Sequence, residues 1–251
     1  MGCSNYHHGC GYKRPDGGYA ATYPILAVRN TMKRIYAMCT SEPGGQVNAH
    51  QSTCCTTPTL AFTTSYWDGE QLGSVPHAAN PLEVLPLDTF RAEFMGRNFG
   101  VPCELLNYAP KPYTLDEALS FSMLHDVLVR PGGVGATLEQ MSEIWRVLSD
   151  FGADGAEFLP YWRNSDWVQT SSPAIRATLY HRPEKGLLMV ISNLGLANEP
   201  AAWVKLDLKD LKLERQPSQA EDTLTGEKFP YADGKINLPV NSMRMRLIWV
   251  K

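Results

Sequence analysis

The chain has 251 residues, of which 43% are hydrophobic and 20% are charged, and its formal net charge is −3. This composition is typical of a soluble globular protein with one or two domains. The 23 Lys and Arg residues are scattered, and no apolar run approaches the roughly 20 residues that span a bilayer, so neither a nucleic acid nor a membrane is expected as a partner.

The N-terminal run "CSNYHHGC" combines cysteine with histidine. All six cysteines lie in the first 103 residues at irregular spacing, which fits neither a disulfide framework nor a C-x-x-C zinc pattern. Two interpretations stay open: Cys3, His7, His8 and Cys10 surround a zinc ion, or they belong to a polar loop whose histidines either have no role or hydrogen-bond a ligand. We favour the loop, with His8 as a substrate-binding residue, and expect no metal site and no cofactor.

Helical and strand patterns then alternate along the chain. Apolar residues three and four positions apart predict an amphipathic helix that begins near Pro24. A second helix is predicted with Asp88 as N-cap and Gly100 as its stop, and two more start at the capping boxes Thr114–Glu117 and Thr137–Gln140. Short strands are predicted over 46–52, in 60–68 after a short helix or loop, and over 101–108, 126–133 and 156–164.

Such alternation predicts a parallel sheet with helical crossovers, either an open α/β fold or a (β/α) barrel. No glycine-rich phosphate-binding run follows a strand, which favours the barrel. Because a full barrel takes about 250 residues, we expect residues 1–165 to form a partial TIM-type barrel of four or five strands. Its two exposed sheet edges predict either a missing N-terminal half or self-association.

The last third of the chain has no helical pattern. Short strands separated by turn residues, including a hairpin turn at Asp233-Gly234, predict an antiparallel β-sandwich over residues 172–251. We expect this sandwich to pack against the barrel, with Trp162 and Trp167 at the junction between the two domains.

The run "SYWDGEQ", Ser65 to Gln71, carries the most chemistry. If a barrel strand ends at Asp68, then Asp68 and Glu70 lie at its carboxyl end, where barrel enzymes place their active sites, and an extended chain would point both carboxylates to one side. Trp67 or Tyr66 would offer a ring face to a sugar. The structural alternative is a strand that ends in an Asp-Gly turn.

Four further polar residues border predicted strands. His50 ends one strand and would donate to a sugar hydroxyl, although a buried, satisfied histidine is an equal alternative. Glu104 and Asn107 border the next strand and Arg130 the one after, and each is a candidate for substrate contact.

The motifs "NYHHGCGY", "NAHQS", "YWDGEQ" and "AEDTLTGEKF", in this order, resemble the C-terminal half of large bacterial proteins related to glycoside hydrolase family 123. The resemblance implies an upstream β-domain, a TIM-type barrel and a following β-sandwich, and it implies hydrolysis of glycosidic bonds, of the N-acetylhexosaminide type in the characterised enzymes. Export to the periplasm or the cell exterior is implied only if the full-length gene carries a signal peptide.

The family also implies an adjacent Asp-Glu pair, in which Asp orients the acetamido group of the sugar and Glu protonates the leaving oxygen. This sequence departs from that pattern, because its adjacent acids, Asp116-Glu117 and Glu221-Asp222, fall in a helix cap and in the sandwich. Two functions therefore stay open: a glycoside hydrolase that uses Asp68 and Glu70, and a non-catalytic carbohydrate-binding or scaffolding remnant of such an enzyme.

Overall fold

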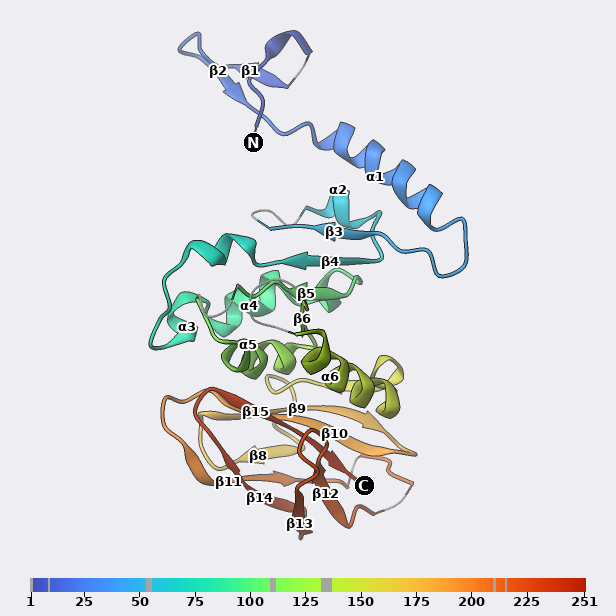
Figure 1. Ribbon diagram of the computed structural model, residues 1–251, viewed down its shortest axis with the longest axis vertical. Helices are drawn as coiled ribbons and strands as arrows, with labels where there is room; N and C mark the ends of the chain where they lie inside the picture. The colour runs from blue at the N-terminus through green and yellow to red at the C-terminus, as the bar shows by residue number, and fades with distance from the viewer. Residues whose placement is uncertain are drawn as a thin grey trace.

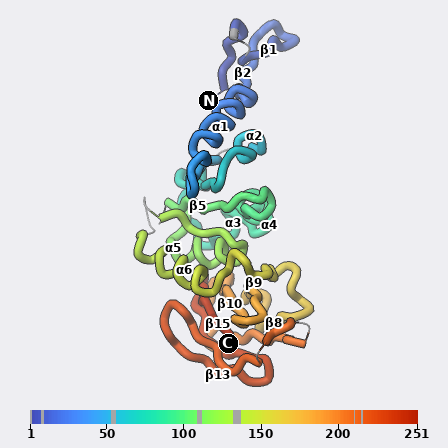
Figure 2. The backbone as a smooth tube through the Cα atoms, turned by 90° about the vertical axis from the view of Figure 1, so that its right-hand side faces the viewer, coloured from blue at the N-terminus to red at the C-terminus, as the bar shows by residue number. Residues whose placement is uncertain are grey.

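The computed structural model describes residues 2–8, 10–52, 56–108, 112–131, 137–209, 211–214 and 216–251. The molecule is elongated (Figure 1): an N-terminal hairpin and helix lie at one end, a small parallel sheet in the middle, and a large antiparallel sheet at the other end. The tube in Figure 2 shows the same order of parts from the side. No helix in the described ranges has both the length and the apolar character needed to cross a membrane.

The N-terminal segment projects from the body of the molecule. It comprises η1 (Tyr6–His8), β1 (Gly11–Lys13), β2 (Tyr19–Ala21) and α1 (Ile25–Cys39). The predicted amphipathic helix is confirmed as α1, yet the structure buries none of its residues, and Leu26 is 75% exposed. Its contact with the body runs through Phe62, whose ring lies against Tyr36 and under the guanidinium of Arg29.

The middle part alternates strands and helices as predicted. Its strands are β3 (Asn48–His50), β4 (Ser65–Asp68), β5 (Cys103–Leu105) and β6 (Leu128–Val129). Its helices are α2 (Thr57–Leu60), η2 (Glu70–Ser74), α3 (Pro81–Val84), α4 (Leu87–Glu93), η3 (Gly96–Asn98), α5 (Leu115–Ser122), η4 (Met123–His125), α6 (Leu138–Phe151) and η5 (Ala153–Gly155). The strands pair in parallel in the order β3-β4-β5-β6, so neighbours in sequence are neighbours in space.

Local signals position α5 and α6 correctly. Both capping boxes form, with Thr114 and Thr137 each accepting from a backbone N–H three residues on, and Gly152 ends α6 in the left-handed conformation. The predicted cap at Asp88 is wrong, because α4 begins at Leu87 after Pro86 and Asp88 lies inside the first turn. The helix also stops early, at Glu93, and the 3-10 turn η3 follows before the chain reaches β5.

The third part is one antiparallel sheet. Its strands are β7 (Glu157–Leu159), β8 (Val168–Thr170), β9 (Ile175–Arg182), β10 (Gly186–Asn193), β11 (Glu199–Leu206), β12 (Gln219–Asp222), β13 (Lys228–Ala232), β14 (Lys235–Val240) and β15 (Arg244–Val250). Their order is β7-β9-β10-β15-β12-β13-β14-β11-β8, and the sheet curls so that its two halves face each other across an inner core. The division into domains at residues 165 and 172 stays a prediction.

Two local details of this sheet bear on the sequence predictions. The hairpin turn at Asp233-Gly234 is confirmed, since both residues have positive φ, 51° and 74°. Strand β7, which was expected to continue the parallel pattern, instead pairs antiparallel with β9 at the edge of the large sheet. The described residues after η5 contain no helix.

Strand β10 joins the helices of the middle part to the antiparallel sheet, because its two faces pack into two different cores. Its side chains alternate, so Leu188 and Val190 join the core beneath α5 and α6, while Leu187, Met189 and Ile191 face the inner core of the curled sheet. Every one of these five residues is fully buried. In Figure 1, α5 and α6 lie between the two sheets. These helices therefore pack against the parallel sheet on one side and the antiparallel sheet on the other.

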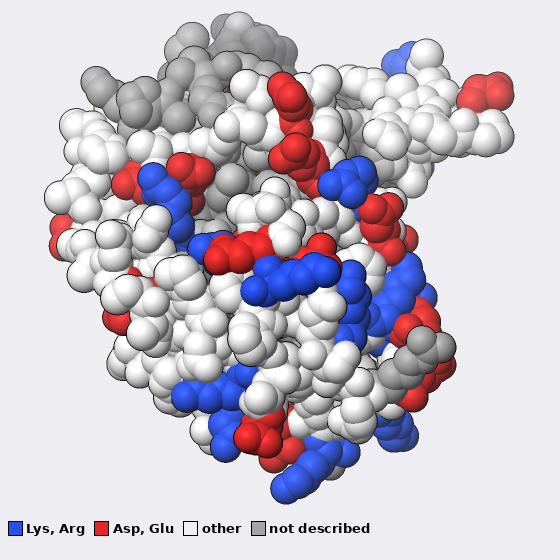
Figure 3. Space-filling view, turned by 60° about the horizontal axis from the view of Figure 1, so that its bottom comes forward, with Lys and Arg blue, Asp and Glu red and all other residues white. Residues whose placement is uncertain are grey.

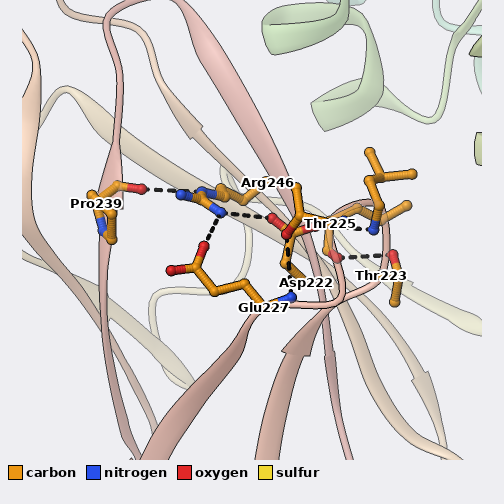
Figure 4. A network of polar contacts seen from close by, with 8 residues as sticks. Asp222, Thr223, Thr225, Glu227, Pro239 and Arg246 are labelled. Atoms are coloured by element: carbon orange, nitrogen blue, oxygen red, sulfur yellow. Dashed lines mark hydrogen bonds and ion pairs between the residues drawn. The ribbon is translucent and has the colours of Figure 1, made fainter.

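A polar network stabilises the turn after β12 (Figure 4). Arg246 contacts both Asp222 (3.0 Å) and Glu227 (2.8 Å) and donates to the carbonyl of Pro239 (3.1 Å). Asp222 is only 2% exposed, and its Oδ1 also accepts the backbone N–H of Leu224 at 3.0 Å. This adjacent acid therefore has a structural role, as its place in the predicted sandwich suggested.

Candidate functional site

A row of polar side chains crosses the parallel sheet on the face opposite the helices. The register pairs His50 of β3 with Trp67 of β4, and Trp67 with Glu104 of β5. Alternate residues of the same strands point the other way into the core, where Tyr66 and Leu105 are fully buried. Three of the predicted substrate-binding residues thus lie side by side because parallel strands align in register.

The row is connected by direct contacts. The rings of His50 and Trp67 stack with centroids 3.8 Å apart and an interplanar angle of 3°. The guanidinium of Arg130 lies 4.8 Å from the centroid of Trp67, forms an ion pair with Glu104, and donates to Asn48 Oδ1 at 3.1 Å. Arg130, which follows β6, is therefore brought into the site from the far side of the sheet.

Glu70 closes one end of this row. Its Oε2 lies 2.9 Å from Nε2 of His50, and both side chains are partly open to water, with 50% and 39% exposed. The backbone N–H of Glu70 donates to the hydroxyl of Ser52, which follows β3, at 3.0 Å. Glu70 is consequently held at the carboxyl end of β4 by groups from the neighbouring strand.

Gly69 separates the two predicted catalytic carboxylates. Its φ of 121° turns the chain out of the strand into η2, and a Cβ at this position would meet the carbonyl of Leu106 at 2.6 Å, so only glycine fits. The expectation of an extended chain, with both carboxylates on one side, is therefore wrong. Asp68 points to the buried side of the sheet while Glu70 joins the row at His50.

Asp68 is a fully buried carboxyl group. Its Oδ1 accepts the backbone N–H of Gly69 at 2.6 Å, whereas Oδ2 has no hydrogen-bond partner among the described residues. Burial raises the pKa of Asp68, and the nearby polar groups of Gln71, Gly69 and Ser52 and the charge of His50 only partly oppose that rise. The site thus contains a carboxyl group that holds its proton more tightly than an exposed aspartate does.

A second carboxyl group, Glu93, lies next to Asp68. Its Oε1 accepts from Nε2 of Gln71 at 3.5 Å, and both burial and the carboxylate of Asp68 raise the pKa of Glu93. The sequence predictions missed this residue because Glu93 ends a helix 25 residues further along the chain. The signal available in the sequence was that Glu93 is a polar residue on the side of an amphipathic helix that faces the sheet.

The remaining predicted residues have different outcomes. Tyr66 is completely buried, with its hydroxyl near backbone carbonyls of α4, so it cannot present a ring face to a sugar and that prediction is wrong. Asn107 is 4% exposed, and its side-chain amide has no partner among the described residues. Tyr108 follows it, and partial burial and the Glu70 carboxylate raise the pKa of Tyr108. The side chain of His8 lies outside the described residues.

The zinc interpretation involves Cys3, His7, His8 and Cys10, and the side chain of His8 lies outside the described part of the chain. No three His, Cys, Asp or Glu side chains there are grouped closely enough to hold a metal ion. The carboxyl end of the sheet carries instead two carboxyl groups in different environments, the buried Asp68 and the partly exposed Glu70.

Comparison with protein families identifies part of the chain. Residues 140–227 match the family model "Glycoside hydrolase 123, C-terminal domain", which confirms the relation to glycoside hydrolase family 123 predicted from the motifs. The matched segment begins in α6 and covers most of the antiparallel sheet, and the candidate site residues described above lie outside it. No curated protein matches the chain.

Solved structures give a fold relation. A family 27 β-L-arabinopyranosidase from Geobacillus stearothermophilus, solved with arabinose, superposes with a TM-score of 0.50 at 11% identity, over 94% of this chain and 64% of its own. Two family 30 xylanases, from Clostridium papyrosolvens and Clostridium acetobutylicum, give TM-scores of 0.43 and 0.45 at 10% and 12% identity. They are matched over 92% and 95% of this chain and 62% and 64% of theirs. The chain therefore spans less than two thirds of each of these glycosidases.

Proposed function

We propose that this chain is part of a glycoside hydrolase whose carboxylates act at the carboxyl end of the parallel sheet. The observation that carries the proposal is the pair Asp68 and Glu70, held apart by Gly69 in two different environments beside His50. Retaining and inverting glycosidases both need one protonated carboxyl group and one carboxylate near the scissile bond.

The environments suggest a division of roles. We assign the proton donor to Asp68, because burial raises its pKa, and the second carboxyl group of the pair to Glu70, which is partly exposed and lies next to His50. Because Asp68 is fully buried and points away from the polar row, its role as proton donor requires a rearrangement that exposes it when substrate binds. Glu104 and Arg130 would then contact sugar hydroxyls, since both lie in the polar row next to Trp67.

A partial (β/α) barrel accounts for the polar row. In a closed barrel, helices cover the outer face of the sheet and the other face lines the interior. Here helices cover one face of β3 to β6 and the polar row occupies the other, while β3 and β6 remain the two edges of the four-stranded sheet. We propose that further polypeptide, either of the same protein or of a second copy, completes this barrel, and that the curled sheet serves as its C-terminal sandwich.

The open edges also favour the second candidate function. If nothing completes the barrel, the chain is a non-catalytic carbohydrate-binding or scaffolding remnant, because half a barrel cannot enclose the scissile bond. Hydrolysis of a panel of aryl glycosides, including N-acetylhexosaminides, by the full-length gene product separates the two candidates.

Substitution of Glu70 tests the site assignment. Glu70→Gln keeps the size of the side chain but removes its charge, and we expect turnover of any hydrolysed glycoside to fall by about 10²- to 10⁴-fold. Glu83→Gln, an equal change at an exposed acid of α3, should leave turnover unchanged. If Glu70→Gln leaves both turnover and the Michaelis constant as they are in the parent, the site lies elsewhere.

The pH profile tests the role of Asp68. A general acid must be protonated, so the rate should fall as the pH rises through the raised pKa of Asp68. Asp68→Asn retains a turn-forming side chain at this position, and it should lower the rate and remove that alkaline limb. If Asp68→Asn still shows the fall in rate at alkaline pH, the proton donor is another group, and Glu93 is the first candidate.

A further inference from the structure

A groove separates α4 from the loop that joins β7 to β8. Its volume is about 790 Å³, and its lining includes Arg91, Arg97, Phe158, Trp162, Arg163 and Trp167. Arg97 pairs at 2.6 Å with Asp126, which comes just before β6, so this part of the groove lies at the amino end of the parallel strands. The groove is therefore distinct from the row at the carboxyl end of the sheet.

Guanidinium groups dominate the charge of the groove. Arg163 is exposed and has no side-chain partner among the described residues. Arg91 lies 5.0 Å from the ring centroid of Trp162 and pairs at 3.2 Å with Asp88, whose side chain is 87% exposed. Such an exposed pair is weak and exchanges readily for another anion. Two arginines are thus available to an anionic ligand, while Arg97 is already engaged by Asp126.

The loop that carries Arg163 and Trp167 is anchored. Asn164, which is 3% exposed, donates from its side-chain amide to the carbonyls of Leu159 (3.1 Å) and Ala177 (2.8 Å). The backbone N–H of Trp167 donates to the carbonyl of Asn164 at 3.0 Å. Trp167 packs partly against the inner core and lines the groove as well, so an aromatic surface and a cation are held close together.

We propose that this groove binds the anionic sugar units of an acidic oligosaccharide. A guanidinium group pairs with a carboxylate or a sulfate through two parallel hydrogen bonds, and an indole ring covers the apolar C–H face of a pyranose. A nucleic acid is a poor fit, because positive and negative side chains are interspersed on the face shown in Figure 3 and the chain carries a net charge of −3. The inference rests on the proposed function for the carbohydrate class of the ligand.

Calorimetric titration of the full chain tests this proposal with four probes: an oligogalacturonide, a chondroitin sulfate oligosaccharide, a neutral xylo-oligosaccharide and an oligoglutamate peptide. We expect one of the two acidic saccharides to bind at least about tenfold more tightly than the neutral one, and the preferred acid identifies the anion. Arg163→Gln and Arg91→Gln should each weaken that binding by about tenfold. Because the two substituted positions are independent and at least partly exposed, a folding defect in one variant would not explain a loss of binding in both.

Arg146→Gln is the matched control, because it removes the same charge from an exposed position on α6. Equal losses in Arg146→Gln and Arg163→Gln would reduce the effect to net charge and overturn the proposal. So would equal binding of the neutral saccharide or of oligoglutamate, or no binding of either acidic saccharide. Glu70→Gln should lower hydrolysis by about 10²- to 10⁴-fold but keep groove binding, so failure of the groove and failure of the hydrolase proposal give different results.

Discussion

The parallel and antiparallel sheets of this protein differ in how many of their faces are covered. Strand β10 of the antiparallel sheet buries both faces, one under the helices and one in the inner core. The parallel strands bury only the face under the helices, and the other carries His50, Trp67 and Glu104. The antiparallel sheet therefore provides a closed core, whereas one face of the parallel sheet carries polar side chains.

The largest effect on stability is expected at β10. Leu188→Ala removes a fully buried side chain between the helices and the antiparallel sheet, and we expect the free energy of unfolding to fall by about 2–5 kcal/mol. Urea unfolding followed by tryptophan fluorescence measures this. Leu196→Ala, at a position 60% exposed, should change stability by less than about 0.5 kcal/mol. Equal effects of the two substitutions would contradict the role given to β10.

A smaller effect is expected in the network of Arg246. Asp222→Asn removes the charge next to Arg246 but retains an oxygen for the turn, and we expect a loss of about 1.5–3 kcal/mol, the range for hydrogen bonds to charged groups. Asp150→Asn breaks the exposed pair with Arg146 and should cost less than about 0.5 kcal/mol. Thermal unfolding compares the two, and a similar shift in both would show that burial of Asp222 is unimportant.

The smallest effect on stability is a pH-dependent one at Asp68. Because burial raises the pKa of this carboxyl group in the folded state, the folded state favours the protonated form, and the free energy of unfolding falls as the pH rises through that pKa. Asp68→Asn does not titrate, so it should be more stable than the parent at about pH 7, and the difference should shrink below about pH 4.

Thermal unfolding at the two pH values measures this difference. Asp154→Asn, at an exposed acid of η5, is the control for removal of one negative charge. A parent that is more stable than Asp68→Asn at neutral pH would mean that the Asp68 carboxylate is favourably bound, as expected of a structural turn residue and not of a strained functional group.

Local physical chemistry made much of the fold predictable. Apolar spacing and capping boxes located α1, α5 and α6, and the alternation of helices with short strands predicted a parallel sheet before the turn-rich strands of the last third. The motifs also predicted the relation to glycoside hydrolase family 123 that residues 140–227 confirm. Each of these signals lies within about ten residues of the structure it specifies.

The candidate site was predictable as a set of strand-end residues but not as an arrangement. Parallel register brings His50, Trp67 and Glu104 into one row, which follows from placing each at the same level of neighbouring strands. The burial of Tyr66 follows from which face the helices cover, and no single strand carries that information. Arg130 and Glu93 reach the site from elements far along the chain.

The sequence by itself therefore determined α1, α5 and α6, the succession of a parallel and an antiparallel part, and the glycine at position 69. Only the tertiary structure decided that Gly69 directs Asp68 inward and Glu70 outward, that β7 joins the antiparallel sheet, and that nine strands curl around one inner core. The physical reason is the distance along the chain over which each effect acts. Helix periodicity and capping act between residues three or four apart. The direction of a side chain, its burial and its pKa depend on which distant segments cover each face of the sheet.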